Sequence, residues 1–297
     1  MDTKIIFFKA QDGIALTGIL FAPEKSTSSA ILYLHGLGGN FYSKSIFAMG
    51  KEACAKGIAF FAMQQRGSHI ADELGYEGKD AFILAGSAFE RFEDSQYDIY
   101  GALSLLRKLG FRRVVLMGKS TGCQKSIYFL YKNGKKSIAK IVKGLVLLSP
   151  VDDRNYDIKN HQKFHKNFHK NILIARRLAR KDPDAIMPKK MLPKDQWPIS
   201  ALRFLSTAEE KSIEGKLLDY KRDLAEFKSI KIPIIAVFGS NDEYMKGVIG
   251  IDKAAARLRE NKFTKKVIVI KRSGHSLYSK KNFPAKKIVK EAYAILS

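Results

Sequence analysis

A serine flanked by two glycines stands at the end of a predicted strand. Ser120 lies between Gly118 and Gly122, directly after the apolar run 114–117, and a helix is predicted over 121–132. Small neighbours allow a sharp strand-to-helix turn that presents the serine hydroxyl above a sheet. The amino terminus of the following helix favours a developing negative charge. The pattern G-x-S-x-G in this position predicts a nucleophilic serine.

A serine hydroxyl is a poor nucleophile at neutral pH, so it needs an imidazole to take its proton and a carboxylate to orient that imidazole. His275 follows the predicted strand 267–270, and Asp242 follows the predicted strand 232–238. In a parallel sheet the loops after the strands lie at one edge, the carboxyl edge. We therefore expect Ser120, Asp242 and His275 to form a catalytic triad.

Other acidic residues compete for the role of the triad acid. Asp152 and Asp153 follow the strand that ends at Leu148, which is another place for a triad carboxylate. Position favours Asp242, and Asp152 is expected to turn the chain into the next segment. A charged cluster precedes the helix that runs to Leu109, and we interpret its acids as helix amino-terminal residues; the cluster contains Glu90, Arg91, Glu93 and Asp94.

Backbone amides for a tetrahedral oxyanion are also predicted. The glycine-rich segment His35-Gly36-Leu37-Gly38-Gly39 ends the apolar strand 30–34. An oxyanion needs N–H donors about 3 Å away, and such donors come from a loop of this kind and from the residue after the nucleophile. Leu37 and Thr121 are therefore the predicted donors.

Alternating strands and helices are expected to position these residues. A hairpin is predicted at the start because an Asp-Gly pair separates two apolar stretches. Further strands are expected at 30–34, 58–63, 114–117, 141–148, 232–238 and 267–270. Helices are expected at 43–56, 92–109 and 121–132. The residues from 66 to 86 are expected to form a loop. This alternation predicts the α/β class, with a mostly parallel central sheet flanked by helices.

One long segment lacks a buried strand. Residues 151–228 contain four prolines as punctuation and are interpreted as a helical cap or lid inserted into a core made of 1–150 and 229–297. The only tryptophan, Trp197, is expected to pack this insertion onto the core or to line an acyl pocket. The hypothesis that this cap opens and closes over the site rests on its length and its placement only.

Taken together, the glycine-rich segment at 35–39, the serine motif, Asp242 and His275 give the chain a resemblance to the α/β-hydrolase superfamily over essentially its full length. The chain order Ser120, Asp242, His275 is the order expected of that superfamily. The elbow segment 116–124 is similar to that of the fungal siderophore-esterase-like branch, whose members cleave ester-linked siderophores, although Lys119 departs from the residues often found before the serine.

The resemblance implies a cofactor-independent serine hydrolase whose substrate is a small-molecule carboxylic ester. Amides, thioesters and siderophore esters are alternatives, because the triad sets the reaction type and the pocket sets the substrate. A different alternative is a catalytically idle fold that acts as a binding protein through its basic cap.

Charge and composition limit the partners and the location. The 297 residues include 53 Lys and Arg against 29 Asp and Glu, a formal net charge of +24. An anionic substrate or a polyanion is possible, because eleven of the basic residues lie in 159–194 against only two acids. Two cysteines are too few for a disulfide framework, and no apolar run is long enough to span a membrane, so a cytoplasmic location is expected.

Three histidines recur at every fourth residue in the insertion. His161, His165 and His169 would line one face of a continuous helix, a geometry that can bind a divalent metal. An apolar stripe at the same spacing instead favours an ordinary amphipathic helix. We therefore predict no metal site and no cofactor.

Overall fold

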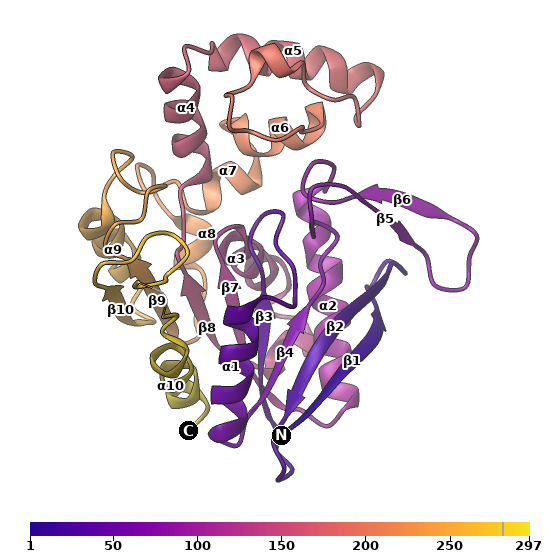
Figure 1. Cartoon of the computed structure of the whole chain (residues 1–297), viewed down its shortest axis with the longest axis vertical. Coiled ribbons are helices and arrows are strands. Elements are labelled where there is room, and N and C mark those ends of the chain that lie inside the picture. The colour runs from indigo at the N-terminus through magenta and orange to yellow at the C-terminus, as the bar shows by residue number, and fades with distance from the viewer. Residues whose placement is uncertain (281) are drawn as a thin grey trace.

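The centre of the molecule is an eight-stranded sheet in which six neighbouring strands run parallel (Figure 1). The computed structural model of the chain describes residues 1–280 and 282–297. In spatial order the strands are β1 (Asp2–Lys9), β2 (Ala15–Ala22), β4 (Ala59–Met63), β3 (Ser29–Leu34), β7 (Arg113–Lys119), β8 (Val142–Leu148), β9 (Ile234–Gly239) and β10 (Thr264–Ile270). This arrangement confirms the predicted α/β class.

Helices cover both faces of the sheet because successive side chains of its central strands point in opposite directions. In β3, Ile31 and Tyr33 pack in one apolar cluster, whereas Leu32 and Leu34 pack in the other. The first cluster is completed by α1 (Lys44–Ala55) and α10 (Ala285–Leu296). The second is completed by α2 (Ser95–Lys108), α3 (Thr121–Asn133), α8 (Ala225–Lys228) and α9 (Ile251–Arg259). Two short 3-10 helices, η1 (Phe92–Asp94) and η2 (Ser137–Ile141), precede α2 and β8.

The opening hairpin is confirmed. Strands β1 and β2 pair antiparallel, with Lys9 opposite Ala15. Gly13 adopts a φ of 101° in the turn, a left-handed conformation that side chains rarely tolerate. The hairpin extends the parallel sheet at one edge, where β2 pairs antiparallel with β4.

The loop predicted over 66–86 is wrong in part. It contains a second hairpin, β5 (Asp72–Gly75) paired antiparallel with β6 (Phe82–Ala85), which projects beside β1 and β2 in Figure 1. Each strand is only four residues long, and Phe82 and Leu84 are exposed. Strands this short that bury so little give almost no apolar periodicity for a sequence to display.

Helices dominate the segment 151–228, which lies beyond the carboxyl ends of β7 and β8 (Figure 1). They are α4 (Asp153–Lys163), α5 (Phe168–Lys181), the 3-10 helix η3 (Lys189–Met191), α6 (Ala201–Ala208), α7 (Ile213–Leu217) and α8. Phe168 and Phe204 lie in a small apolar cluster of this segment, separate from the two clusters of the sheet. The interpretation of this segment as a cap or lid stays a prediction.

The predicted single face for the three histidines is wrong. Helix α4 ends at Lys163, His165 has a left-handed φ of 54°, and α5 begins only at Phe168. His161 is fully buried and its Nδ1 donates a hydrogen bond to the Asp157 carbonyl oxygen, whereas His165 and His169 are exposed. The reversal between the two helices separates residues that a continuous helix would align.

Among the residues that the structure describes, no helix is both long enough and apolar enough to cross a bilayer.

Candidate active site

Ser120 occupies a strained turn between β7 and α3. Its φ of 52° and ψ of −126° lie outside the regions that residues with side chains favour. The chain passes so closely here that a Cβ on Gly118 would lie 2.2 Å from the Gly122 carbonyl oxygen, and a Cβ on Gly122 would lie 2.6 Å from the Leu34 carbonyl oxygen. The two glycines are therefore required by the turn itself, as the sequence pattern predicts.

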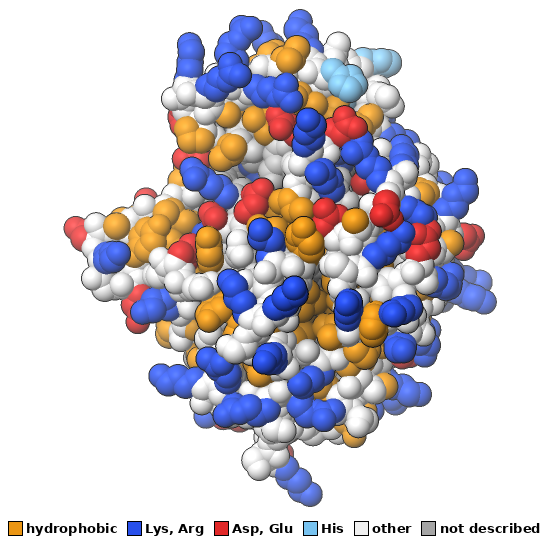
Figure 2. All heavy atoms as spheres, turned by 180° about the vertical axis from the view of Figure 1, so that it is seen from behind, with side chains coloured by type: hydrophobic (Ala, Val, Ile, Leu, Met, Phe, Trp, Pro, Cys, Tyr) orange, Lys and Arg blue, Asp and Glu red, His pale blue; other side chains and the backbone are white. Residues whose placement is uncertain are grey.

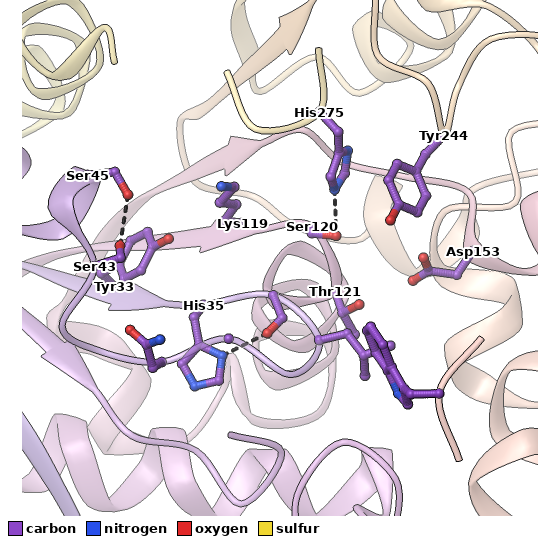
Figure 3. A pocket seen from close by; sticks show the side chains of 15 residues that line it. Tyr33, His35, Ser43, Ser45, Lys119, Ser120, Thr121, Asp153, Tyr244 and His275 are labelled. Carbon is purple, nitrogen blue, oxygen red and sulfur yellow. Dashed lines mark hydrogen bonds between the residues drawn. The ribbon is translucent and has the colours of Figure 1, made fainter. Parts of the chain in front are cut away.

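The structure brings Ser120, His275 and Asp242 together from three different loops. The Ser120 hydroxyl lies 2.9 Å from His275 Nε2 (Figure 3). His275 Nδ1 lies 3.0 and 3.1 Å from the two carboxylate oxygens of Asp242. Asp242 follows β9 and is 1% exposed, and His275 follows β10. With Nδ1–H donating to the carboxylate, Nε2 is free to accept the serine proton.

Three contacts around the imidazole had no signal in the sequence. The backbone N–H of His275 donates to Glu243 Oε2 at 2.9 Å, and the Ser149 hydroxyl donates to the His275 carbonyl oxygen at 2.8 Å. The Tyr244 ring packs on the imidazole with centroids 4.3 Å apart. These contacts fix the position of the loop and the tilt of the ring. They depend on how loops far apart in sequence meet, so only the assembled sheet edge reveals them.

In the part of the chain that the structure describes, neither of the two competing acids hydrogen-bonds to His275. Asp152 caps helix α4 by accepting from the backbone N–H of Asn155, and it also accepts from the backbone N–H of Tyr220. Asp153 accepts a hydrogen bond of 2.5 Å from Gln124 Nε2. Asp152 thus turns the chain into the following segment, as predicted.

The glycine-rich loop after β3 is held by a buried histidine. His35 Nδ1 lies 2.8 Å from the Gly36 carbonyl oxygen and Nε2 lies 2.8 Å from the Ser68 hydroxyl. Burial lowers the pKa of His35 to about 4, so the ring is neutral at pH 7 and donates through one nitrogen only. A Cβ on Gly36 would lie 2.8 Å from the Ser120 Cβ. The loop is thereby pressed against the serine, and Leu37 lines the same cavity as Thr121.

A cavity of about 320 Å³ opens beside the serine (Figure 3). Ser120, His275, Leu37 and Thr121 all line it, together with residues from the segment 151–228. Lys119 also lines it, and burial lowers the pKa of its ammonium group. A small-molecule substrate could therefore reach the serine, the imidazole and both predicted oxyanion donors at once.

A second, smaller cavity of about 160 Å³ adjoins the first. Five residues line both cavities: Leu37, Thr121, Asp153, Trp197 and Tyr244. Trp197 thus lies at the junction of the two cavities. Of the two roles predicted for it, packing the insertion onto the core or lining a pocket, the structure shows that it lines a pocket. The remaining wall of the smaller cavity comes mainly from α4 and α6.

Comparison with known proteins places the chain in a family. The family DUF1749, described as a protein of unknown function, matches residues 92–296, which include Ser120, Asp242 and His275. The chain belongs to the DUF1749 family. No curated protein sequence matches it.

Solved structures with similar folds extend the comparison of this DUF1749 protein over its whole length. The siderophore hydrolase EstB from Aspergillus fumigatus has a TM-score of 0.70 at 16% identity, covering 99% of this chain and 97% of that one. The α/β-hydrolase GrgF from Penicillium sp. sh18 has a TM-score of 0.68 at 13% identity, covering 100% and 98%. Est1E from Butyrivibrio proteoclasticus, with ferulic acid bound, has a TM-score of 0.66 at 14% identity, covering 98% and 99%. The likeness confirms the predicted α/β-hydrolase fold.

Glu90 does not have the role that we expected for it in this DUF1749 protein. It is not a helix amino-terminal acid, because its carboxylate is buried and accepts from Lys125 Nζ on α3 at 2.6 Å. Its other oxygen lies 3.7 Å from Arg203 on α6, and Arg203 in turn makes two hydrogen bonds of 2.6 and 2.8 Å to Glu214 on α7. Glu90, Lys125, Arg203 and Glu214 form what we call the buried ion network.

Two further carboxyl groups lie near this network and have no ion pair with any residue that the structure describes. Burial, together with the negative charges of Glu214 and Asp157, raises the pKa of Asp153 well above its usual value. Burial raises the pKa of Asp157 to about 7, although Thr207 and Arg203 act in the opposite direction. Both acids line the smaller cavity.

Asp157→Asn is expected to stabilise the protein at pH 8 relative to the wild type. The carboxyl pKa is about 3.8 in the unfolded chain and about 7 in the folded protein, so the folded state holds the proton more tightly. The stabilising effect of this carboxyl is complete below pH 4 and is lost as the pH rises to 7. Thermal unfolding measured between pH 5 and 8 should show a Tm difference between Asp157→Asn and the wild type that grows in favour of the variant as the pH rises. A constant difference in Tm across that range would contradict the assignment.

Proposed function

We propose that this DUF1749 protein is a cofactor-independent serine hydrolase that cleaves carboxylic esters. The observation that carries the proposal is the chain of hydrogen bonds from Ser120 through His275 to Asp242 at the mouth of a cavity. Nucleophile and base lie within hydrogen-bond reach and the base is oriented by a third group, which is the arrangement that activates a serine.

In the proposed first half-reaction, Ser120 Oγ attacks the ester carbonyl carbon while His275 Nε2 takes the hydroxyl proton. The carbonyl oxygen becomes an oxyanion that accepts hydrogen bonds from the backbone N–H groups of Leu37 and Thr121. Thr121 is the first residue of α3, so its N–H has no acceptor within the helix. The tetrahedral intermediate then collapses, and His275 gives its proton to the departing alcohol.

The second half-reaction releases the acyl group. Water attacks the acyl-enzyme carbonyl carbon while His275 takes one of its protons, and the same proton returns to Ser120 Oγ when the carboxylic acid leaves. Throughout, the Asp242 carboxylate accepts from Nδ1–H and stabilises the imidazolium that forms twice in each turnover.

The similar folds are consistent with an ester substrate. One of them is described as a siderophore hydrolase and another has ferulic acid bound. Siderophore esters, amides and thioesters stay as alternatives to a simple carboxylic ester, because the shape of the cavity and not the triad selects among them.

The basic charge gains no support as a binding surface. Lys and Arg side chains are spread over the whole face shown in Figure 2 and do not gather into one patch. A polyanion partner therefore rests on the net charge and on the eleven Lys and Arg residues of 159–194. Net charge constrains solubility and encounter more than function. A cytoplasmic location is proposed on the two cysteines, Cys54 and Cys123, which are not paired.

Labelling with a fluorophosphonate probe tests the proposed function. Wild-type protein should gain one covalent adduct on the peptide that contains Ser120, and Ser120→Ala should gain none. Hydrolysis of p-nitrophenyl esters of increasing chain length then measures the size of the acyl pocket. Folded wild-type protein that takes no label would overturn the proposal and favour the idle fold acting as a binding protein.

A further inference from the structure

The smaller cavity has an acidic wall in a strongly basic protein. Asp153, Asp157 and Asp195 all line it, although basic residues outnumber acidic ones by 24 in the whole chain. Asp153 also lines the larger cavity beside Ser120, and Figure 3 shows its carboxylate directed to the side on which Ser120 lies. A group bound in the smaller cavity would therefore be part of a molecule whose other end reaches the serine.

The cations of the buried ion network do not neutralise this wall. Lys125 is committed to Glu90 at 2.6 Å, and Arg203 is committed to Glu214 through two hydrogen bonds. The two cations of the network are therefore already balanced by its two carboxylates, and no positive charge of the network is left for Asp153 and Asp157. Burial raises the pKa of both acids, and a cation bound beside them would favour their ionised form.

A polar donor in the same wall also lacks a partner. Arg203 is 1% exposed and lines the smaller cavity, yet within the described residues its Nε has no hydrogen-bond acceptor. A buried guanidinium nitrogen without an acceptor is uncommon in native proteins. This nitrogen is itself fully buried, so the wall offers a ligand its carboxylate oxygens, which match a cationic group.

The two cavities differ in charge. The Lys119 ammonium lines the larger cavity. Among the described residues that line the smaller cavity, Arg203 is the only cation, and Glu214 already neutralises it. A positively charged group is repelled from the side of Lys119 and attracted to the side of Asp153 and Asp157. The aromatic residues Tyr156 and Trp197 also line the smaller cavity.

We propose that the smaller cavity binds a primary ammonium group of the ester substrate, with Asp153 and Asp157 as the carboxylates that hold it. The inference rests on the proposed function, because it names the class of ester that the serine would cleave. It makes Asp153 and Asp157 specificity-determining residues, with no part in bond cleavage.

Matched pairs of esters test this inference. On the acyl side, p-nitrophenyl 6-aminohexanoate is compared with p-nitrophenyl heptanoate, in which a methyl group replaces the amine; on the alcohol side, 6-aminohexyl butyrate is compared with heptyl butyrate. In one of the two pairs the wild type should have a kcat/KM at least about 10-fold higher for the amine, the size expected for one well-placed charge pair. Asp153→Asn and Asp157→Asn should each lower that ratio, and the double variant should bring it close to 1.

Asp80→Asn is the matched control, because it makes the same chemical change at an exposed residue of the β5–β6 turn. It should keep the wild-type ratio. Two outcomes would overturn the inference while leaving the proposed function intact. The first is a kcat/KM ratio near 1 in both pairs for wild-type protein that hydrolyses p-nitrophenyl heptanoate. The second is a preference for the amine that survives in the double variant.

A binding measurement separates the two proposals if no ester is cleaved. At pH 8, n-hexylamine should raise the Tm of the wild type more than 1-hexanol does, because a ligand bound only by the folded state stabilises it. The difference should disappear in the Asp153→Asn, Asp157→Asn double variant. Equal effects of the amine and the alcohol on the wild type would refute ammonium binding whether or not the serine is active.

Discussion

Asp242→Asn is expected to lower kcat toward a p-nitrophenyl ester by about four orders of magnitude while leaving the Tm within a few degrees of the wild type. The carboxylate holds His275 with Nδ1–H directed toward Asp242, at 3.0 and 3.1 Å, so that Nε2 faces Ser120 as an acceptor. An asparagine can donate through its amide nitrogen and so stabilise the other tautomer. The ring would then present N–H to the serine and could not take its proton.

The other acid after a strand provides the matched control. Asp152→Asn removes the same charge, but Asp152 caps α4 and accepts from the backbone N–H groups of Asn155 and Tyr220. An asparagine oxygen can still cap a helix, so this variant should change kcat less than about 10-fold. If Asp152→Asn lost activity by orders of magnitude and Asp242→Asn kept it, the acid would have to be assigned to the earlier strand.

The site could be predicted from sequence to the extent that it depends on local geometry. A strand, two glycines and a helix around Ser120 define a turn that few other residues can form, and the close contacts of Gly118 and Gly122 explain why. Asp242 and His275 were predictable because parallel strands deliver their following loops to one edge. In each case the sequence of a short segment predicts both its local structure and its position at the edge of the sheet.

Features that depend on contacts between distant segments could not be predicted in this way. Glu90, Lys125 and Arg203 lie in three separate parts of the chain, and each has the sequence environment of an ordinary exposed residue. Only their burial together shows that they neutralise one another. The break at His165 escaped prediction for a related reason, because the apolar stripe continues on both sides of it and periodicity cannot show a change of direction.

The buried ion network suggests how the segment 151–228 is held on the rest of the molecule. Arg203 is on α6 within that segment, whereas Glu90 precedes α2 and Lys125 lies on α3. Arg203→Met is expected to lower the free energy of unfolding by about 3–5 kcal/mol, because it leaves carboxylates buried without their cation. Chemical denaturation monitored by circular dichroism would measure the loss.

An exposed arginine of the same segment gives the comparison that identifies the cause. Arg176 on α5 pairs with Glu209 at 2.7 Å, but both side chains are in contact with solvent. Arg176→Met should therefore cost no more than about 1 kcal/mol. Adding Glu214→Leu to Arg203→Met should recover part of the lost stability, since it removes one of the carboxylates left unpaired. If adding Glu214→Leu instead lowered the free energy of unfolding further, by as much as Arg203→Met alone does, the arginine would be acting through packing of its side chain and not through charge.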